Sequence, residues 1–343
     1  NSTQVIANWL VGREIVEEEQ GGRSRASYGV SLLNDLSMRL QAEFGSGYSE
    51  QNLRYMRQFY REYPELLNGL QIRHTPSGKS MEGVIRHTPR GEFRANLDSL
   101  IPHAPHLKSW TPGHLHPSLA WSLYRHFLRV ENTETRAFYE IESIKNNWSA
   151  RELERQINSL LFERLAKSKD KKGLMKLATR GHIIAKPSDA FKDPLVMEFL
   201  GLPESPRMIE SDLEQALINN LQLFLLELGK GFAFVARQER LTLDGDHFYI
   251  DLVFYHTVLK CFVIIDLKTG KLTHQDLGQL QLYVNYYDRE RRTEGDNPTL
   301  GLILCADKND AVVKYTLGAE QEKKIFASRY KLHLPTEAEL KTE

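Results

Sequence analysis

The chain has 343 residues, with 45 basic and 45 acidic side chains and a formal net charge of zero. Its 41% apolar and 26% charged residues exclude a wholly disordered chain, and no apolar run reaches about 18 residues, which excludes a membrane-spanning helix. The length indicates two domains with cores large enough to need no disulfide or structural metal.

The neutral total conceals an uneven division of charge. Residues 1–190 hold 27 basic and 21 acidic side chains, whereas residues 191–343 hold 18 and 24. A basic first half suits contacts with phosphate, and an acidic second half suits a site that concentrates carboxylates. The alternative is an ordinary solvated surface, and the charge balance alone does not decide between the two interpretations.

The first elements of the chain are predicted to be helices. Apolar residues recur with helical spacing over residues 4–20 and 28–44, and glycines end both patterns. Ser49 is placed to cap a third helix, which Pro64 ends. Helix, short glycine turn and helix form the outline of a helix-turn-helix.

The third predicted helix, residues 50–63, has a basic side. Arg54, Arg57 and Arg61 fall on one stripe, opposite an apolar side. A DNA recognition helix needs an apolar back and a front rich in hydrogen-bond donors, and this pattern fits that description. The alternative interpretation is an exposed amphipathic helix without a ligand.

The segment 68–117 is rich in proline, glycine and histidine and lacks periodicity, which predicts a long loop or a β-ribbon. Helical patterns return at 118–129 and 133–147. Ser149 and Glu152 then form a capping box that predicts one further helix.

That helix is expected to end near Lys167, where a polar, charged linker follows up to Gly173. We therefore expect a first, mostly α-helical domain over residues 1–167 and a second domain over residues 174–343.

The second half predicts an α/β domain. Its expected elements are a helix at 209–228, strands at 232–241, 247–256 and 260–268, a helix at 274–287 and a strand at 299–305. Asp244-Gly245 suits the turn of a hairpin between the first two strands. The order predicts one mixed sheet with helices and an α+β fold for the whole chain. Cys261 and Cys305 lie in apolar strands and are expected to be buried free thiols of a cytoplasmic protein.

Three charged residues interrupt two of these apolar strands. Asp251 lies in one strand, and Asp266 and Lys268 lie in the next. Burying a carboxylate in such a run is costly unless it is paired or bound to a metal. Residues 266 and 268 share a face of their strand, and a hairpin pairing would bring Asp251 to the level of Asp266.

Such a set has a chemical use. Two carboxylates can hold Mg²⁺, which keeps several waters and commonly takes up phosphate oxygens. The lysine could orient or deprotonate the attacking water, or neutralise charge in the transition state. The competing interpretation is a buried Asp–Lys ion pair that only links two strands.

The wider pattern resembles a known family. Glu214 lies on the helix before these strands, and Gln279 lies on the helix after them. The order Glu, Asp, Asp-x-Lys, Gln on helix, strand, strand, helix resembles the core of the PD-(D/E)XK nucleases. The stretches that resemble its YhcG-type branch are 231–238, 248–256 and 278–280 in the second half, and 28–29, 36–37, 43–45, 52–53, 59–60 and 148–157 in the first.

The resemblance implies a restriction-endonuclease-like domain fused to a helical, winged-helix-like DNA-binding domain. It makes Asp251 and Asp266 metal ligands, Lys268 the catalytic lysine and Glu214 an accessory acid that also reaches the metal. Gln279 would orient the lysine or contact phosphate. Relatives often have Glu where Asp266 stands, and Asp keeps the charge with a shorter reach.

Two further residues, Arg237 and Gln238, are candidates for DNA contacts at the first strand. The alternative is that they only cover a strand edge with charge.

The leading hypothesis is a cytoplasmic endonuclease that uses Mg²⁺, or Mn²⁺, to hydrolyse DNA. A homodimer would suit the cutting of both strands, and the sequence does not distinguish DNA from RNA. One alternative is an inactive nucleic-acid-binding or scaffold protein that keeps the nuclease fold. Another is an interaction module in which helices within residues 133–167 mediate oligomerisation.

Overall fold

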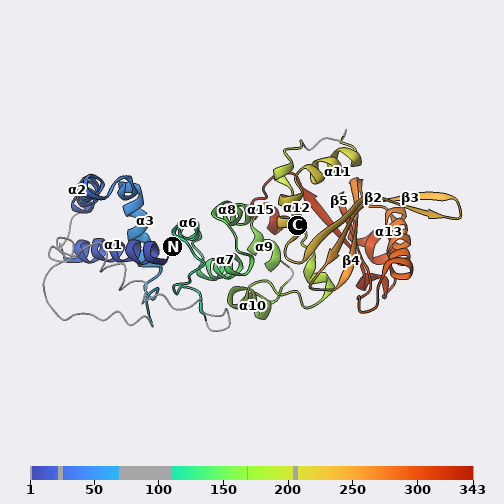
Figure 1. Ribbon diagram of the computed structural model, residues 1–343, viewed down its shortest axis with the longest axis horizontal. Helices are drawn as coiled ribbons and strands as arrows, with labels where there is room; N and C mark the ends of the chain where they lie inside the picture. The colour runs from blue at the N-terminus through green and yellow to red at the C-terminus, as the bar shows by residue number, and fades with distance from the viewer. Residues whose placement is uncertain (1, 22–25, 69–109, 168, 204–207, 343) are drawn as a thin grey trace. The chain divides into compact units, whose positions relative to one another are not determined.

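The computed structural model describes residues 2–21, 26–68, 110–167, 169–203 and 208–342 (Figure 1). Most of the predicted loop 68–117 therefore lies outside the described residues. Within the described ranges, no helix combines the length and apolarity needed to cross a membrane. The chain forms two compact units: unit 1 comprises Asn1–Glu154 with Ala178–Gly181, and unit 2 comprises Arg155–Leu177 with His182–Glu343.

Unit 1 is helical. Its described α-helices are α1 (Ser2–Gly21), α2 (Ala26–Phe44), α3 (Glu50–Glu62), α6 (Trp121–Phe127), α7 (Thr133–Asn146) and the first part of α8 (Ala150–Asn158). Ser49 caps α3 as predicted, because its side chain accepts a hydrogen bond from the Asn52 amide. The described part of unit 1 contains no strand, so it shows no wing of the winged-helix-like domain that the resemblance implied.

Helices α1 and α3 pack closely. A Cβ atom at Gly12 of α1 would lie 1.9 Å from the carbonyl oxygen of Met56 on α3, so only glycine permits this approach. The Trp9 indole donates to the Tyr63 carbonyl oxygen at 2.8 Å, and Phe59 is fully buried. The apolar back of α3 therefore forms part of the core of unit 1.

Two predicted long helices are each divided in the structure. Leu160, in the left-handed conformation at φ 53°, separates α8 from α9 (Leu161–Ala166). Asn220 has non-helical backbone angles, φ −118° and ψ 31°, and separates α11 (Glu210–Asn219) from α12 (Leu221–Leu228). Its side chain donates to the Ala216 carbonyl oxygen. Helical apolar spacing continues through both breaks, which is why the sequence pattern did not reveal them.

The predicted linker also contains a helix. Helix α10 (Lys171–Arg180) begins inside it, and residues 155–177 belong to unit 2. Residues 155–177 belong to unit 2 because a buried ion cluster around Glu227 of α12 holds the start of this segment there. The Glu227 carboxylate lies 2.5 Å from Arg164 and 3.1 Å from Arg155, which ties α9 and the end of α8 to unit 2.

Unit 2 is built on a mixed six-stranded sheet in the order β1-β6-β5-β4-β3-β2. The strands are β1 (Leu195–Val196), β2 (Phe232–Leu243), β3 (Asp246–His256), β4 (Cys261–Lys271), β5 (Leu300–Asp307) and β6 (Ile325–Lys331). β2, β3 and β4 are antiparallel, whereas β4, β5, β6 and β1 are parallel. The predicted α+β fold is confirmed, and β1 and β6 are additions that the sequence did not indicate.

Helices cover both faces of this sheet (Figure 1). Leu213 and Phe224, from α11 and α12, belong to the core on one face. Leu280 and Val284, from α13 (His274–Tyr286), belong to the core on the other, where Gly301 of β5 leaves room for both side chains. The remaining α-helices among the described residues are α14 (Asp310–Thr316) and α15 (Glu337–Thr342).

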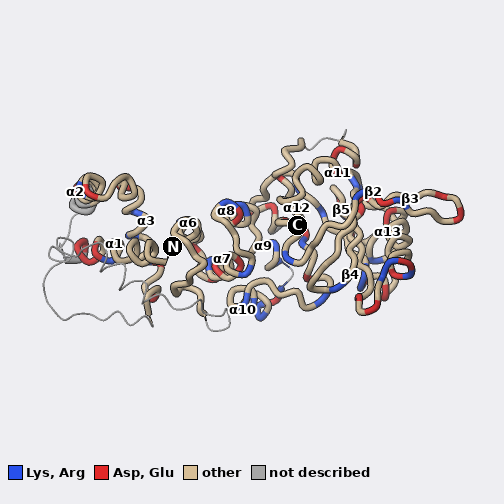
Figure 2. The backbone as a smooth tube through the Cα atoms, in the orientation of Figure 1, with Lys and Arg blue, Asp and Glu red and all other residues tan. Residues whose placement is uncertain are grey.

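The β2–β3 hairpin extends beyond the rest of the sheet (Figure 1). Its predicted turn is confirmed: Asp244 and Gly245 both have positive φ, at 48° and 94°. Asp244 and Asp246 make the tip acidic, as the red segments of Figure 2 show.

The two cysteines, Cys261 and Cys305, are both free and buried, as predicted. Burial raises the pKa of each thiol to about 12.

Candidate active site

The pairing of β3 with β4 brings two predicted site residues together. Leu252 pairs with Ile265, so the preceding Asp251 comes to the level of Asp266, as the hairpin prediction required. The Leu267 amide donates a hydrogen bond to Oδ2 of Asp251 at 2.8 Å. The carboxylate of one strand therefore satisfies a backbone donor of the next, which holds Asp251 beside β4.

Asp266 and Lys268 form an ion pair on β4. Nζ of Lys268 lies 2.9 Å from Oδ2 of Asp266 and 3.4 Å from Oε2 of Glu210, at the start of α11. Asp266 is only 1% exposed, whereas Lys268 is partly accessible. Lys268 therefore joins a buried carboxylate to the more exposed edge of the site.

Gln238 links Glu214 to Asp251. Its Nε2 donates to Oε2 of Glu214 at 2.7 Å and to Oδ1 of Asp251 at 3.1 Å. Gln238 is in the left-handed conformation at φ 46°, although it lies within strand β2. Backbone strain of this kind persists only where the surroundings enforce it, and it is concentrated at functional sites.

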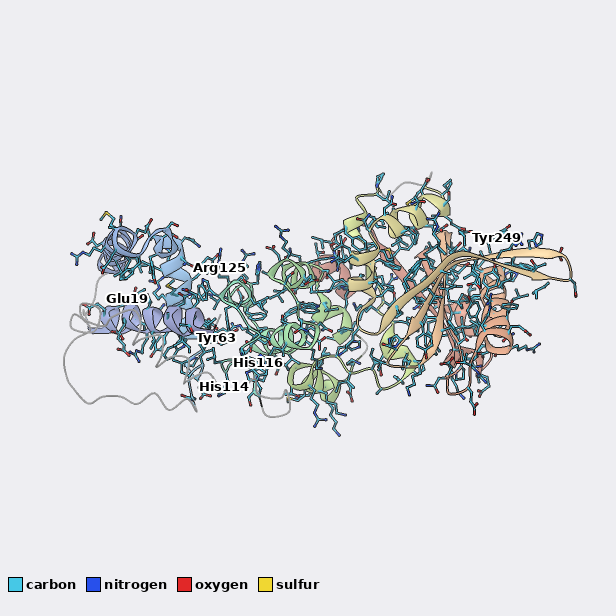
Figure 3. The ribbon with its side chains drawn as sticks, in the orientation of Figure 1. Glu19, Tyr63, His114, His116, Arg125 and Tyr249 are labelled. Atoms are coloured by element: carbon cyan, nitrogen blue, oxygen red, sulfur yellow. The ribbon has the colours of Figure 1, made fainter. Side chains whose placement is uncertain are left out.

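Gln279 reaches the site through a tyrosine. Its Nε2 donates to the Tyr283 hydroxyl at 2.5 Å, and that hydroxyl donates to the Tyr249 carbonyl oxygen at 3.1 Å. Tyr249 lies on β3 where the hairpin leaves the sheet (Figure 3). Burial raises the pKa of Tyr283, and so does the negative charge of Asp266 and Asp251. The hydroxyl is therefore within the electrostatic field of the acids.

The carboxylates of the site repel one another. Burial raises the pKa of Asp251, Asp266 and Glu214, and the charge of Asp251 raises the pKa of the other two further. Burial acts to lower the pKa of Lys268, but Asp266, Glu210 and Asp251 outweigh it and raise that pKa above its ordinary value. Lys268 is therefore a firmly protonated cation among a surplus of acids.

The donor chemistry of this site suits a hard divalent cation. Carboxylate oxygens are the ligands that Mg²⁺ prefers, and Asp251 and Asp266 lie on neighbouring strands. Across the described residues, no group of three or more His, Cys, Asp or Glu side chains is close enough to hold a metal. Glu214 accordingly reaches Asp251 through Gln238 instead of sharing a ligand set with it.

The predicted DNA-binding arginines of α3 all have acidic partners. Arg57 and Arg61 bind the two carboxylate oxygens of Glu19 on α1 (labelled in Figure 3) at 2.8 and 3.0 Å. Arg54 pairs with Glu50 one turn earlier. These arginines are therefore ordered on one side of α3, with Arg54 and Arg61 half exposed.

The other two predicted DNA-binding residues behave differently. Arg237 extends toward α11, where it donates to Gln215 at 3.2 Å and lies 3.9 Å from Glu214. Gln238 points into the acid cluster, where it donates hydrogen bonds to Glu214 and Asp251.

The sequence interpretation missed two residues of the site, Glu210 and Tyr283. Both have a signal in helical spacing, because each lies four residues from a predicted residue, Glu214 or Gln279. Side chains four apart share a helix face, so each predicted residue identifies a neighbour that faces the same way.

Comparison with known families matches both parts of the chain. Residues 188–343 match the YhcG PDDEXK nuclease domain, and residues 1–76 and 85–164 match the DUF1016 N-terminal domain. The chain is 40% identical over 334 residues to the Escherichia coli (strain K12) protein named "Putative nuclease YhcG". That similarity covers 97% of this chain and 84% of the relative.

Two solved structures show more distant similarity. One is a repair endonuclease from Pyrococcus abyssi, at 15% identity and a TM-score of 0.26, covering 39% of this chain and 50% of that one. The other is an EndoMS–dsDNA2 complex, at 14% identity and a TM-score of 0.28, covering 39% of this chain and 47% of that one.

Proposed function

Because the chain belongs to the YhcG PDDEXK nuclease family, we propose that unit 2 is a divalent-metal-dependent endonuclease that hydrolyses DNA phosphodiester bonds. The observation that carries the proposal is the cluster of Asp251, Asp266 and Lys268 on two paired strands. An excess of buried carboxylates with raised pKa values beside one lysine suits phosphate chemistry better than it suits fold stability.

Asp251 and Asp266 would hold Mg²⁺ or Mn²⁺, with Glu214 as an outer acid. When bound, the ion supplies a water of lowered pKa and offsets charge on the phosphate. Gln238 fixes the Asp251 and Glu214 carboxylates through its two hydrogen bonds. The Leu267 amide fixes the other oxygen of Asp251, so the direction of this ligand is set by the backbone of β4.

Lys268 would stabilise the negative charge that develops on the phosphate. Its raised pKa keeps the ammonium protonated, so it acts as a cation and not as a base in this arrangement. Tyr283 and Gln279 form a hydrogen-bonding pair at the same site that is suited to a phosphate oxygen or to the attacking water.

Unit 1 would position the DNA. Its support is the helix pattern of α1 to α3 and the stripe of Arg54, Arg57 and Arg61 on α3. Glu19 orders two of these arginines, and a phosphate would compete with Glu19 for them.

The test is cleavage of plasmid, linear and branched DNA with Mg²⁺ or Mn²⁺, comparing wild type with Lys268→Ala. Lys271→Ala is the matched control, because Lys271 is an exposed lysine on the same strand. Metal-dependent cutting that Lys268→Ala loses and Lys271→Ala keeps would support the proposal. Binding of DNA without cutting by any of the three proteins would favour the inactive binding or scaffold alternative. The same assay with RNA of matched sequence would show whether the protein cleaves DNA, RNA or both.

A further inference from the structure

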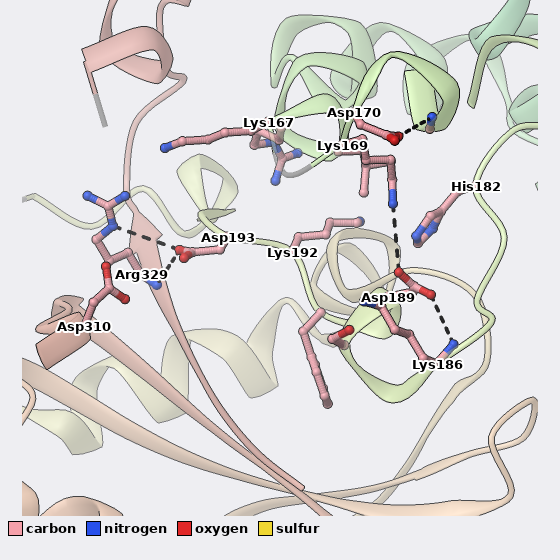
Figure 4. A pocket seen from close by; sticks show the side chains of 15 residues that line it. Lys167, Lys169, Asp170, His182, Lys186, Asp189, Lys192, Asp193, Asp310 and Arg329 are labelled. Carbon is pink, nitrogen blue, oxygen red and sulfur yellow. Dashed lines mark hydrogen bonds and ion pairs between the residues drawn. The ribbon is translucent and has the colours of Figure 1, made fainter. Parts of the chain in front are cut away.

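A polar cavity lies in unit 2, away from the candidate active site (Figure 4). Its volume is about 780 Å³, and every residue that lines it belongs to unit 2. The lining comes from α9, α10, the segment 182–193, the start of α14 and β6. This is the β1–β6 edge of the sheet, whereas the acid cluster lies on β3 and β4.

The lining is strongly charged, with an excess of basic side chains. Six lysines or arginines and one histidine meet four aspartates there. The basic residues are Arg164, Lys167, Lys169, Lys186, Lys192, Arg329 and His182, and the acids are Asp170, Asp189, Asp193 and Asp310. Figure 4 shows His182 and Arg329 on opposite sides of the cavity, with Lys192 between them. A ligand inside would therefore meet more cations than anions.

Two of these cations are fixed by the interior of the protein. Arg164 and Lys192 are only 4% and 7% exposed, and both bind Glu227. Arg164 donates to the Glu227 carboxylate, and Lys192 donates to the Glu227 carbonyl oxygen. They are held in place before any ligand arrives, which reduces the entropy that binding would cost.

The aspartates do not cancel the field inside the cavity. Asp189 lies 3.9 Å from Lys169, and Asp193 lies 2.8 Å from Lys308 and 4.0 Å from Arg329. Burial, Lys192 and Lys169 together lower the pKa of His182 to about 4, and the opposing effect of Asp189 is smaller. The potential at the imidazole is thus positive.

We propose that this cavity binds a nucleotide through its phosphate group. Lysines and arginines on several elements can contact a phosphate from different sides. The aspartates would accept hydrogen bonds from sugar hydroxyls or base amino groups, which a simple inorganic anion lacks. Leu165 and Phe191 provide the apolar part of the wall for a base. The volume falls within the range of small-molecule sites, about 300–1,000 Å³.

The nucleotide could come from two sources with the same chemistry. One is a free nucleotide, and the other is the phosphorylated end of a nucleic-acid strand. The inference does not depend on the nuclease chemistry, because the two sites share no residue.

The test is isothermal titration calorimetry on the full chain with EDTA, in wild type and in Asp251→Asn. The probes are thymidine 5′-monophosphate, inorganic phosphate, and oligothymidylate with either a 5′-phosphate or a 5′-hydroxyl. Lys186→Glu is the main variant, because Lys186 lines the cavity and is exposed, so its substitution leaves the core unchanged. Lys172→Glu is its control, because this exposed lysine of α10 is not part of the lining.

Saturable binding of the monophosphate that Lys186→Glu weakens by about tenfold or more, and that Lys172→Glu and Asp251→Asn leave unchanged, supports the proposal. Binding of the 5′-phosphorylated oligonucleotide and of no other probe also supports the proposal, and it identifies a strand end as the source. Binding by no probe, equal affinity for inorganic phosphate and the monophosphate, or an equal loss in both lysine variants would overturn it. Because these measurements use EDTA and Asp251→Asn, their failure leaves the nuclease proposal unaffected.

Discussion

Two buried acid clusters in unit 2 have opposite charge balances. Glu227 is fully buried, but Arg164, Arg155 and Lys192 surround it and lower its pKa in spite of burial. Asp266 is almost as deeply buried, yet Lys268 is shared among Asp266, Asp251 and Glu210, and the pKa of Asp266 is raised. One cluster has more cations than acids, and the other has more acids than cations.

The difference separates a cluster that stabilises the fold from one for which we propose a chemical role. Around Glu227 the favourable charge interactions offset the cost of desolvation, and the cluster joins α8, α9 and α12. Around Asp266 the same cost is not offset by groups of the protein, so a divalent cation would relieve the repulsion.

Neutralising the acids of the second cluster should remove activity without loss of stability. We expect Asp251→Asn and Asp266→Asn each to lower the cleavage rate by about 10³-fold or more, on the order of 4 kcal/mol in the barrier. Thermal unfolding should be unchanged or shifted upward, because each substitution removes a repelling charge. Variants that cut DNA at the wild-type rate would contradict the site assignment.

Neutralising the acid of the first cluster should have the reverse result. We expect Glu227→Gln to reduce the free energy of unfolding of unit 2 by about 3–5 kcal/mol, since Arg164 would remain buried beside a neutral group. Glu198→Gln is the control: this more exposed partner of Arg155 should change stability by about 1 kcal/mol or less.

Circular dichroism would follow unfolding of both units in that experiment. Tryptophan fluorescence reports unit 1 alone, because all four tryptophans belong to it. An equal fall in the free energy of unfolding for Glu227→Gln and Glu198→Gln would show that the buried and the partly exposed ion pairs do not differ.

Glu140 of unit 1 is intermediate between the two clusters, because it has hydrogen-bond donors and one arginine near it. Burial raises its pKa to about 7, although the Tyr63 hydroxyl and the Gly113 amide donate to it and Arg136 lies nearby. The folded state therefore holds the proton more tightly than the unfolded state. Its contribution to stability is complete below about pH 4.5 and is lost as the pH rises through about 7.

The expected loss is on the order of 3 kcal/mol between these limits. Urea denaturation followed by tryptophan fluorescence at several pH values would measure it, and Glu140→Gln should flatten the dependence. An unchanged slope in Glu140→Gln would assign the pH dependence to other groups.

Added Mg²⁺ should stabilise the cluster around Asp266 and not the cluster around Glu227. We expect Mg²⁺ at about a hundred times its Kd to raise the free energy of unfolding of unit 2 by about 2.7 kcal/mol. Differential scanning calorimetry would detect the shift, which Asp251→Asn should abolish and Glu198→Gln should keep. A shift of the same size in Asp251→Asn would place the ion elsewhere.

The arginines of α3 provide the smallest test, because Arg57 and Arg61 are already paired with one acid, Glu19. If unit 1 binds DNA, the double substitution Arg57→Ala with Arg61→Ala should weaken binding several-fold and reduce the salt slope by about two. Arg13→Ala on α1, which removes ion pairs with Glu14 and Glu17, should leave the slope unchanged. Fluorescence anisotropy at several salt concentrations would measure both.

Local signals in the sequence predicted the parts of the fold that depend on neighbouring residues. The capping box of Ser149 and Glu152 and the Asp244-Gly245 turn are both present. The placement of Asp251 beside Asp266 followed from the alternation of side chains along each strand and from the short turn between the two strands. These features arise from a few adjacent residues, so tertiary contacts did not override them.

Features that depend on distant contacts could not be predicted in this way. Gln238 is an ordinary polar residue in the sequence, and only the left-handed backbone turns it toward Glu214 and Asp251. Leu160 has no property of a helix breaker, and the bonds of Arg164 to Ser159 and Glu227 accompany the break there. The third cation around Glu227, Lys192, comes from a segment without a recognisable pattern.

The buried thiols have a practical consequence for labelling. Cys261 and Cys305 are the only cysteines of the chain, and a thiol with a pKa of about 12 holds very little reactive thiolate at neutral pH. A cysteine introduced at an exposed position, such as Val258→Cys or Tyr315→Cys, would therefore react selectively with maleimide dyes or spin labels. Distances within unit 2 could then be followed in solution without first removing the native cysteines.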